Sequence, residues 1–203
     1  HTQRAYDNFG DSGQQHDTVF LRAYLQVKKA AALANRELGY LEAEKAGHII
    51  AAIDLLLAGN AVFDKKDQLD DVYEKLFTDK LVSRRVILTK GGLKIGLFSM
   101  LGKDADEVAP KAAPVTFSRQ KSFAKKMVKE LKGEKCDLII CISHSGLSKD
   151  KSGAWVGEDY EIAKKVKGLG LIVSGHSHSR LDQPLVVNGI PIVQTGEFGK
   201  AVG

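Results

Sequence analysis

Two apolar segments of the chain each end in a histidine close to a glycine. The first, residues 137–142, continues into Ser143-His144-Ser145-Gly146. The second, residues 169–173, continues into Ser174-Gly175-His176-Ser177-His178. Short apolar runs bounded by turn residues are typical of buried strands, and glycine permits the sharp turn that follows. The sequence therefore predicts two buried strands, each of which presents histidine at its exit.

The segments around these strands predict how they pair. Helical patterns cover residues 117–131, before the first strand, and 159–167, between the two strands. Strand–helix–strand order with apolar strands favours a parallel sheet covered on both faces. Ligands collect at the carboxyl ends of such strands, so both strands could deliver histidine to one site.

The histidines themselves indicate a metal site. His176 and His178 stand at i and i+2 and would share one side of an extended segment. Neutral imidazoles are the commonest protein ligands of borderline transition metals. The alternative is a pair of turn residues that merely ends a strand, and His144 in the matching place one strand away disfavours it.

These two motifs resemble those of the calcineurin-like metallophosphoesterases, and they are most similar to the 5′-nucleotidase branch. Residues 90–98 resemble the strand pair that precedes the motifs, and residues 192–200 the segment that follows them. The resemblance covers residues 55–203. It implies an α/β fold, the four-layer α/β/β/α metallophosphoesterase sandwich, in a single domain over residues 1–203 whose N-terminal part is atypical or incomplete.

The resemblance also implies a function, that of a metal-dependent phosphoester hydrolase of 5′-nucleotidase type. Two divalent ions (Zn, Mn or Fe) would activate a bridging water against a small phosphorylated substrate such as a nucleotide. By this resemblance, His144 and His176 are expected to bind one ion and His178 the other. Asp11, in a Gly-Asp pair, is the candidate bridging ligand, although a turn aspartate is an equally good interpretation. A periplasmic or extracellular location is expected from the resemblance alone.

Two ligand segments of that family have no match in the chain. No Asp-x-His occurs in the 203 residues, and no Asn-His is present to supply the Gly-Asn-His-Glu loop. Enzymatic activity is therefore expected if these segments exist in the full protein. The alternative is a catalytically inactive domain of this fold that serves as a binding or structural module with a scaffold partner. No catalytic or substrate-binding residue is assigned.

The segment Gly59-Asn60-Ala61-Val62-Phe63-Asp64 admits two interpretations. It fits the Gly-Asn-His-Glu loop with the histidine and glutamate replaced, and it also fits a later strand of the family. The later strand is favoured because Asn60 lies only about thirty residues before Gly91-Gly92. Asn60 is then a structural residue.

Local signals predict the remaining elements. Residues 70–77 are expected to form a short helical or irregular stretch. Residues 85–89 and 93–100 are expected to form a hairpin at Gly91-Gly92, and residues 185–187 and 190–193 another at Asn188-Gly189. Helices are also expected over residues 17–38 and from about residue 41. In the helix over 117–131, the inward positions are Phe117, Ala124, Met127, Val128 and Leu131, and the outward ones are Lys121, Lys125, Lys129 and Lys132.

Composition excludes some functions. The net charge is +5 and 43% of the residues are hydrophobic, as in an ordinary globular domain. No apolar run approaches the roughly eighteen residues of a membrane span, and no nucleic-acid-binding signal is present. Cys136 and Cys141 flank one strand, and their odd spacing of five points them to opposite faces, so they are expected to be free thiols.

Overall fold

The computed structural model describes residues 57, 59–64, 66, 71–78, 82–103, 115–197 and 200. They fall in two compact units, of which one comprises Leu57–Val62 and Arg84–Gly203 and the other includes Phe63–Ser83. In the latter unit, the stretch expected to be helical or irregular is helix α4 (Asp71–Thr78), and Phe63 packs edge-on against Phe77 with ring centroids 5.4 Å apart. The helices predicted over residues 17–38 and from residue 41 lie outside the described residues.

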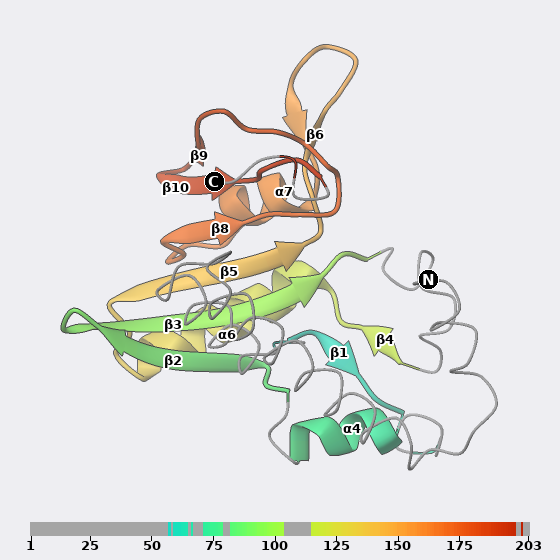
Figure 1. Ribbon diagram of the computed structural model, residues 1–203, viewed down its shortest axis with the longest axis vertical. Coiled ribbons are helices and arrows are strands. Elements are labelled where there is room, and N and C mark those ends of the chain that lie inside the picture. Colours follow the sequence, from blue (N-terminus) through green and yellow to red (C-terminus); the bar gives the residue numbers. More distant parts are fainter. Residues whose placement is uncertain are drawn as a thin grey trace, which may run out of the picture. The chain divides into compact units, whose positions relative to one another are not determined.

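The first unit is built on a six-stranded mixed sheet with the order β2-β3-β5-β8-β10-β9 (Figure 1). The strands are β2 (Arg85–Lys90), β3 (Leu93–Leu101), β5 (Leu138–His144), β8 (Leu171–Val173), β9 (Leu185–Val187) and β10 (Ile190–Val193). Strands β3, β5, β8 and β10 are parallel, which confirms the prediction for the centre of the sheet. The two predicted hairpins are also present, and each adds one antiparallel edge strand.

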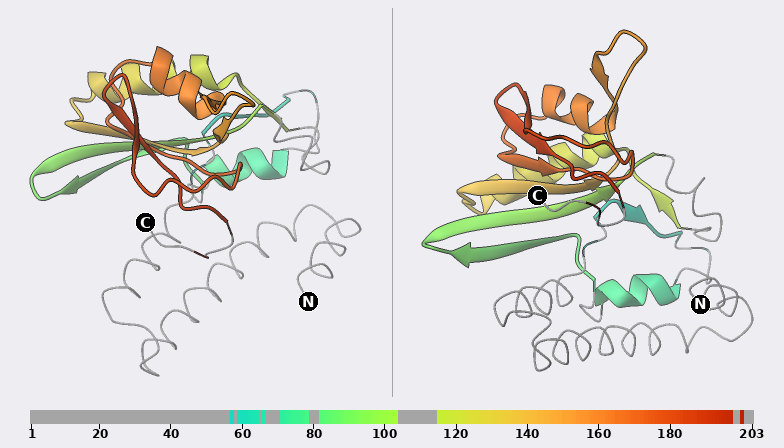
Figure 2. Two further views of the ribbon diagram at one scale, coloured as in Figure 1. Left: turned by 90° about the horizontal axis from the view of Figure 1, so that it is seen from above. Right: turned by 45° about the horizontal axis from the view of Figure 1, so that its top comes forward.

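Two helices pack side by side on one face of this sheet (Figure 2). They are α6 (Gln120–Gly133) and α7 (Glu158–Lys165), which precede β5 and β8 respectively. Two short strand pairs accompany them: β1 (Ala61–Val62) with β4 (Thr116–Phe117), and β6 (Ser148–Lys149) with β7 (Trp155–Val156). In the part of the chain that the structure describes, no helix is both long and apolar enough to cross a membrane.

The prediction for α6 is right along its length and wrong at its start. Phe117 was expected to begin the helix, but it pairs with Ala61 in the β1–β4 ladder, and the Ser118 amide donates to the Asn60 carbonyl at 2.8 Å. This long-range pairing overrides the local helical pattern. Further along, the expected inward positions are buried, namely Ala124, Met127, Val128 and Leu131, and the expected outward lysines are exposed.

Strand β5 shows how the sheet separates its two faces. Ile139 and Cys141 are 3% and 0% exposed, whereas Ile142 on the other face is 39% exposed. Ile139 and Cys141 belong to the core beneath α6 and α7, together with Phe98, Met127, Leu131, Val166, Ile172 and Ile192. Both cysteines are free, as predicted. Within the described residues of this unit, helices cover one face only, so they form a sheet and a helical layer of the expected four-layer sandwich, not all of it.

Three polar side chains lie side by side where the central strands end. The register aligns Ile142 of β5 with Val173 of β8, and Val173 with Val193 of β10. The next residues along these strands are Ser143, Ser174 and Gln194, and the Ser174 amide donates to the Val193 carbonyl at 2.8 Å. Ser143 and Gln194 are buried at 4% and 3% exposure. A polar row therefore crosses the carboxyl ends of the parallel strands.

Asp159, near the start of α7, completes this row. Its side chain is fully buried, and it accepts hydrogen bonds from Ser143 Oγ at 2.5 Å, Ser174 Oγ at 2.5 Å and the Gly146 amide at 3.1 Å. Its own amide donates to the Gly146 carbonyl at 3.1 Å. A buried carboxylate is tolerated when its oxygens are hydrogen-bonded in this way. The carboxylate thus joins α7 to the ends of β5 and β8.

Asn60 is a structural residue, as the favoured interpretation holds. It is 1% exposed and donates to the carbonyls of Leu101 and Ser118, each at 3.0 Å, while its Oδ1 accepts from the Leu101 amide at 2.8 Å. These three bonds join β1 to the end of β3 and to the residue after β4. Asn60 therefore satisfies backbone groups where these segments meet.

We expect Asn60→Ala to lower the free energy of unfolding by roughly 2–4 kcal/mol, because the Leu101 amide and the Ser118 carbonyl would lose their partner in a buried site. Urea denaturation followed by circular dichroism measures the loss. Val62→Ala, at a 43% exposed position of the adjoining strand β1, is the control and should cost under about 1 kcal/mol. Equal losses in the two variants would contradict the role given to Asn60.

The buried carboxyl of Asp159 predicts how the stability of the fold depends on pH. Burial raises the pKa of its carboxyl from 3.8 to about 6, against the hydrogen bonds from Ser143, Ser174 and Gly146, which lower it. Because the folded state holds this proton more tightly, Asp159 makes the free energy of unfolding fall as the pH rises from about 4 to about 6. Two pKa units correspond to about 3 kcal/mol.

Asp159→Asn should remove this contribution. The difference in unfolding free energy, wild type minus variant, should decline between pH 4 and pH 6 and level off above it. Asp150 and Glu161 have pKa values lowered by hydrogen bonds from Ser152 and Lys165, so they make the free energy of unfolding rise with pH. Both proteins share this contribution, and it cancels in the difference. Chemical denaturation at several pH values provides the curve, and a constant difference would contradict the raised pKa.

Candidate metal centre

His144 and His176 come together from neighbouring parallel strands, as predicted. His144 is the last residue of β5, and by alternation from the buried Ser143 its side chain lies on the face opposite α6 and α7. His176 lies in the segment after β8. The two imidazole rings meet edge to face, with centroids 5.0 Å apart and an interplanar angle of 68°. Two imidazoles at this separation suit the shared coordination of one metal ion.

The segment after β8 is not extended. The prediction that His176 and His178 share one side of an extended segment is therefore wrong. His176 has φ 76° and His178 has φ 56°. These values lie in the left-handed region, which residues other than glycine rarely adopt. The i and i+2 side chains therefore do not share a side as on a strand. His176 turns to His144, whereas His178 turns to Glu197.

Hydrogen bonds on both sides hold this strained segment. Ser177 Oγ donates to the Leu147 carbonyl at 2.6 Å, and the Leu147 amide donates to Ser177 Oγ at 3.1 Å, so the segments after β5 and β8 are bonded to each other. On the other side, Gln194 Oε1 accepts from the amides of His178 and Ser179 at 3.2 and 3.0 Å. Left-handed residues of this kind persist only where their surroundings fix them, and they gather at functional sites.

Glu197 is a candidate site residue without a role in the sequence analysis. Its Oε2 lies 3.0 Å from His178 Nδ1, and its Oε1 is paired with Lys200 Nζ. Histidines that bind metals commonly donate their second nitrogen to a carboxylate, which fixes the ring and its tautomer. The contact with Glu197 therefore orients the His178 ring. Glu197 lies in the segment 192–200 that resembles the family, which was the one available signal for it.

The surroundings of His144 favour the neutral form of its imidazole, which is the form that can bind a metal. Partial burial lowers its pKa, and so do the neighbouring positive charges that His176 and His178 would carry. A neutral imidazole offers the lone pair that a metal requires. Among the described residues, no group of three or more histidine, cysteine or acidic side chains has metal-binding geometry. His144 and His176 are two candidate ligands of one ion, while Asp11 lies outside the described residues.

A cavity of about 230 Å³ adjoins His176. Its walls come from the segments after β3 and β5, the start of α7 and the segment after β8, and they include Lys103, Ser145, Glu158 and Ser177. Ser145 Oγ is buried there without a hydrogen-bond partner among the described residues. The cavity therefore offers polar space next to the paired histidines.

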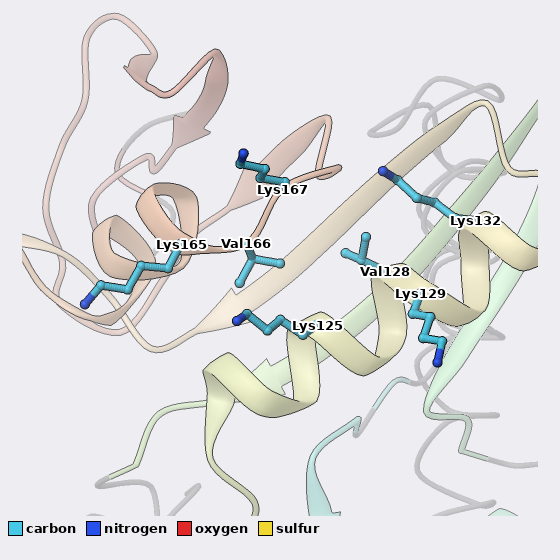
Figure 3. Close-up of a pocket in the computed structure, with 7 residues that line it drawn as sticks. All are labelled: Lys125, Val128, Lys129, Lys132, Lys165, Val166 and Lys167. Atoms are coloured by element: carbon cyan, nitrogen blue, oxygen red, sulfur yellow. The ribbon is translucent and has the colours of Figure 1, made fainter.

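A larger cavity, of about 500 Å³, lies between α6 and α7 (Figure 3). Val128 and Val166 lie between its lysines, which are Lys125, Lys129, Lys132, Lys165 and Lys167. No histidine or carboxylate lines it, and it occupies the helical face, opposite to the face of His144. It holds none of the ligand types that metal chemistry needs, so the histidines mark the candidate centre.

The contact between Gly175 and His144 can be tested. A Cβ atom at Gly175 would lie 3.0 Å from His144 Nδ1 and 3.5 Å from the Ser143 carbonyl oxygen. We expect Gly175→Ala to displace the His144 ring by a few tenths of an ångström and to shift its imidazole signals in ¹H–¹⁵N NMR spectra. Gly133→Ala, with no atom within 4 Å of the new Cβ, should leave them in place. His144 signals unchanged by both substitutions would show that the contact is absent.

Comparison with known proteins gives two kinds of match. The family model described as "Calcineurin-like phosphoesterase" matches residues 8–180. The "Trifunctional nucleotide phosphoesterase protein YfkN" of Bacillus subtilis is 30% identical over 122 residues, which are 58% of this chain and 8% of that protein. A shorter match of a different kind, 52% identical over 58 residues, is to "Fumarate hydratase class II" of Halobacterium salinarum and covers 29% of this chain and 12% of that protein.

Solved structures agree with the family match at the level of the fold. The 5′-nucleotidase precursor from Thermus thermophilus superimposes with a TM-score of 0.56 at 22% identity, over 75% of this chain and 31% of that one. The chain thus spans under a third of the length of each of these relatives. The matched α/β fold with its mixed sheet, together with a family model that covers most of the sequence, shows that the chain belongs to the calcineurin-like phosphoesterase family.

Proposed function

We propose that this chain contributes to a metal-dependent phosphohydrolase of 5′-nucleotidase type. The observation that carries the proposal is the meeting of His144 and His176, delivered by adjacent parallel strands, with ring centroids 5.0 Å apart. Two features support a ligand role for them. The pKa of His144 is lowered, and the backbone of His176 is held in a conformation that costs energy and aims its ring at His144.

The family typically binds a pair of metal ions, and several residues of this chain are candidates to hold them or to orient their ligands. His144 and His176 would hold one ion and His178 the other, with Glu197 fixing the His178 ring through Nδ1. Asp11 stays the candidate for a bridging ligand. Such a metal pair supplies an activated water at neutral pH and neutralises the charge on phosphoryl oxygens.

The substrate proposed is a small phosphorylated molecule, with nucleotides as the first class to test. The support comes from relatives, since one is named a nucleotide phosphoesterase and another a 5′-nucleotidase precursor. The cavity beside His176 has room for part of a polar ligand, and Ser145 and Lys103 are among the residues that line it.

A second candidate is a catalytically inactive domain of the same family that binds a scaffold partner. It is favoured by the absence of any Asp-x-His or Asn-His from the 203 residues. The 58-residue match to fumarate hydratase is a further departure from an ordinary phosphoesterase. This candidate requires that no divalent metal supports turnover.

The experiment is a hydrolysis assay after chelation and reconstitution. The purified protein is assayed with nucleoside 5′-monophosphates and with bis(p-nitrophenyl) phosphate, with Mn²⁺ or Zn²⁺ restored. We expect metal-dependent turnover, and we expect His144→Ala and His176→Ala each to lower kcat/KM by roughly 100-fold or more, because each removes a ligand. His178→Ala should have a comparable effect.

Asp182→Asn is the matched control, since Asp182 is exposed near the same segment and pairs with Arg180 at 2.9 Å. It should keep wild-type activity. Wild-type protein that binds metal without any turnover would favour the inactive candidate. Turnover that survives in the His144 and His176 variants would refute this location for the centre.

A further inference from the structure

We propose that Asp159 is a positioning residue that couples the two histidine-bearing segments, so that metal binding by His144 and His176 depends on its carboxylate. The inference rests on the proposed function in one respect, that these histidines bind metal. It does not place Asp159 among the metal ligands. It assigns a role to a buried acidic side chain that the proposed chemistry leaves unused.

Asp159 cannot reach a ligand itself. Its side chain is 0% exposed and bonds Ser143, which alternation places on the helical face, whereas the next residue, His144, lies on the opposite face of β5. Any effect of Asp159 on the centre therefore passes through the residues that it bonds.

Those residues bracket His144. Asp159 Oδ1 accepts from Ser143 Oγ, directly before His144, and Asp159 Oδ2 accepts from the Gly146 amide, two residues after it. The Asp159 amide also donates to the Gly146 carbonyl. The backbone on both sides of His144 is therefore anchored to the first turn of α7.

The same carboxylate reaches the second segment. Asp159 Oδ2 accepts from Ser174 Oγ at 2.5 Å, two residues before His176. Ser174 donates its proton to Asp159, so its oxygen is free to accept from the Gln194 side-chain amide at 3.1 Å. Gln194 Oε1 in turn accepts from the amides of His178 and Ser179. One chain of hydrogen bonds thus runs from Asp159 to the backbone of His178.

The energetics argue against a role in packing alone. A buried carboxylate costs several kcal/mol unless its partners satisfy it, and an apolar residue of similar volume would hold α7 on the sheet at lower cost. What an apolar residue would not provide is a fixed spacing between the ends of β5 and β8. Outer residues of this kind affect metal affinity through the orientation of the ligands.

The test compares zinc affinity, by isothermal titration calorimetry, in folded variants of the protein. Asp159→Asn should weaken Zn²⁺ binding by roughly 10- to 100-fold. Ser143→Ala and Ser174→Ala should each weaken it by a smaller factor, since each removes one of the bonds. Asp137→Asn is the matched control, because that exposed carboxylate accepts from the Lys94 amide at 2.7 Å near the start of β5, far along the strand from His144. It should leave the affinity unchanged.

A measurement without metal separates this inference from the proposed function. In metal-free protein, amide hydrogen exchange at Gly146, His178 and Ser179 should be at least about tenfold faster in Asp159→Asn than in wild type, with exchange in β2 and β3 unchanged. A merely structural role would instead speed exchange throughout the sheet. Wild-type protein that binds no zinc would refute the proposed function, and the exchange pattern alone would then decide the coupling.

Two results would overturn the inference. One is a folded Asp159→Asn protein with wild-type zinc affinity and wild-type exchange in both segments. The other is uniform acceleration of exchange across the sheet. If Asp159→Asn does not fold, Ser143→Ala and Ser174→Ala decide the matter, since each keeps the carboxylate and removes one donor, and faster exchange confined to the two segments would support the coupling.

Discussion

Backbone hydrogen bonds between parallel β5 and β8 align Ile142 with Val173, and the arrangement of the candidate centre follows from that alignment. The two strands leave the sheet at the same edge, so Ser143 and Ser174 face α7 together while His144 and His176 meet. Strand β10 pairs with β8 so that Val193 aligns with Val173, and this alignment places Gln194 next to Ser174. The mixed sheet thus places the scaffold contacts of Ser143 on one face and the candidate ligand His144 on the other, although the two residues are neighbours in sequence.

Much of this fold could be predicted from local signals. The apolar strands, the hairpins at Gly91-Gly92 and Asn188-Gly189, and the buried side of α6 each depend on residues close in sequence. The approach of His144 to His176 was also predictable, because parallel strands with similar exits share an edge. These features need only the period of the pattern and the turn residues.

What the sequence did not predict depends on contacts far along the chain. Phe117 joins a strand because Ala61, more than fifty residues earlier, pairs with it. Asp159 stands at the start of a predicted helix, and its burial against Ser143 and Ser174 depends on how α7 packs. The left-handed backbone of His178 and its pairing with Glu197 likewise follow from tertiary contacts that no local pattern encodes.

The positive φ angles of His176 and His178 restrict which side chains these positions accept for reasons separate from chemistry. β-Branched residues are excluded by their backbone cost, while glycine and asparagine relieve it. Selection for stability alone would therefore move both positions away from histidine. Variants of this chain that keep both histidines would do so against the stability gained from glycine, and only a functional role would balance that loss. The residues found at these two positions in such variants therefore indicate whether the metal centre is functional.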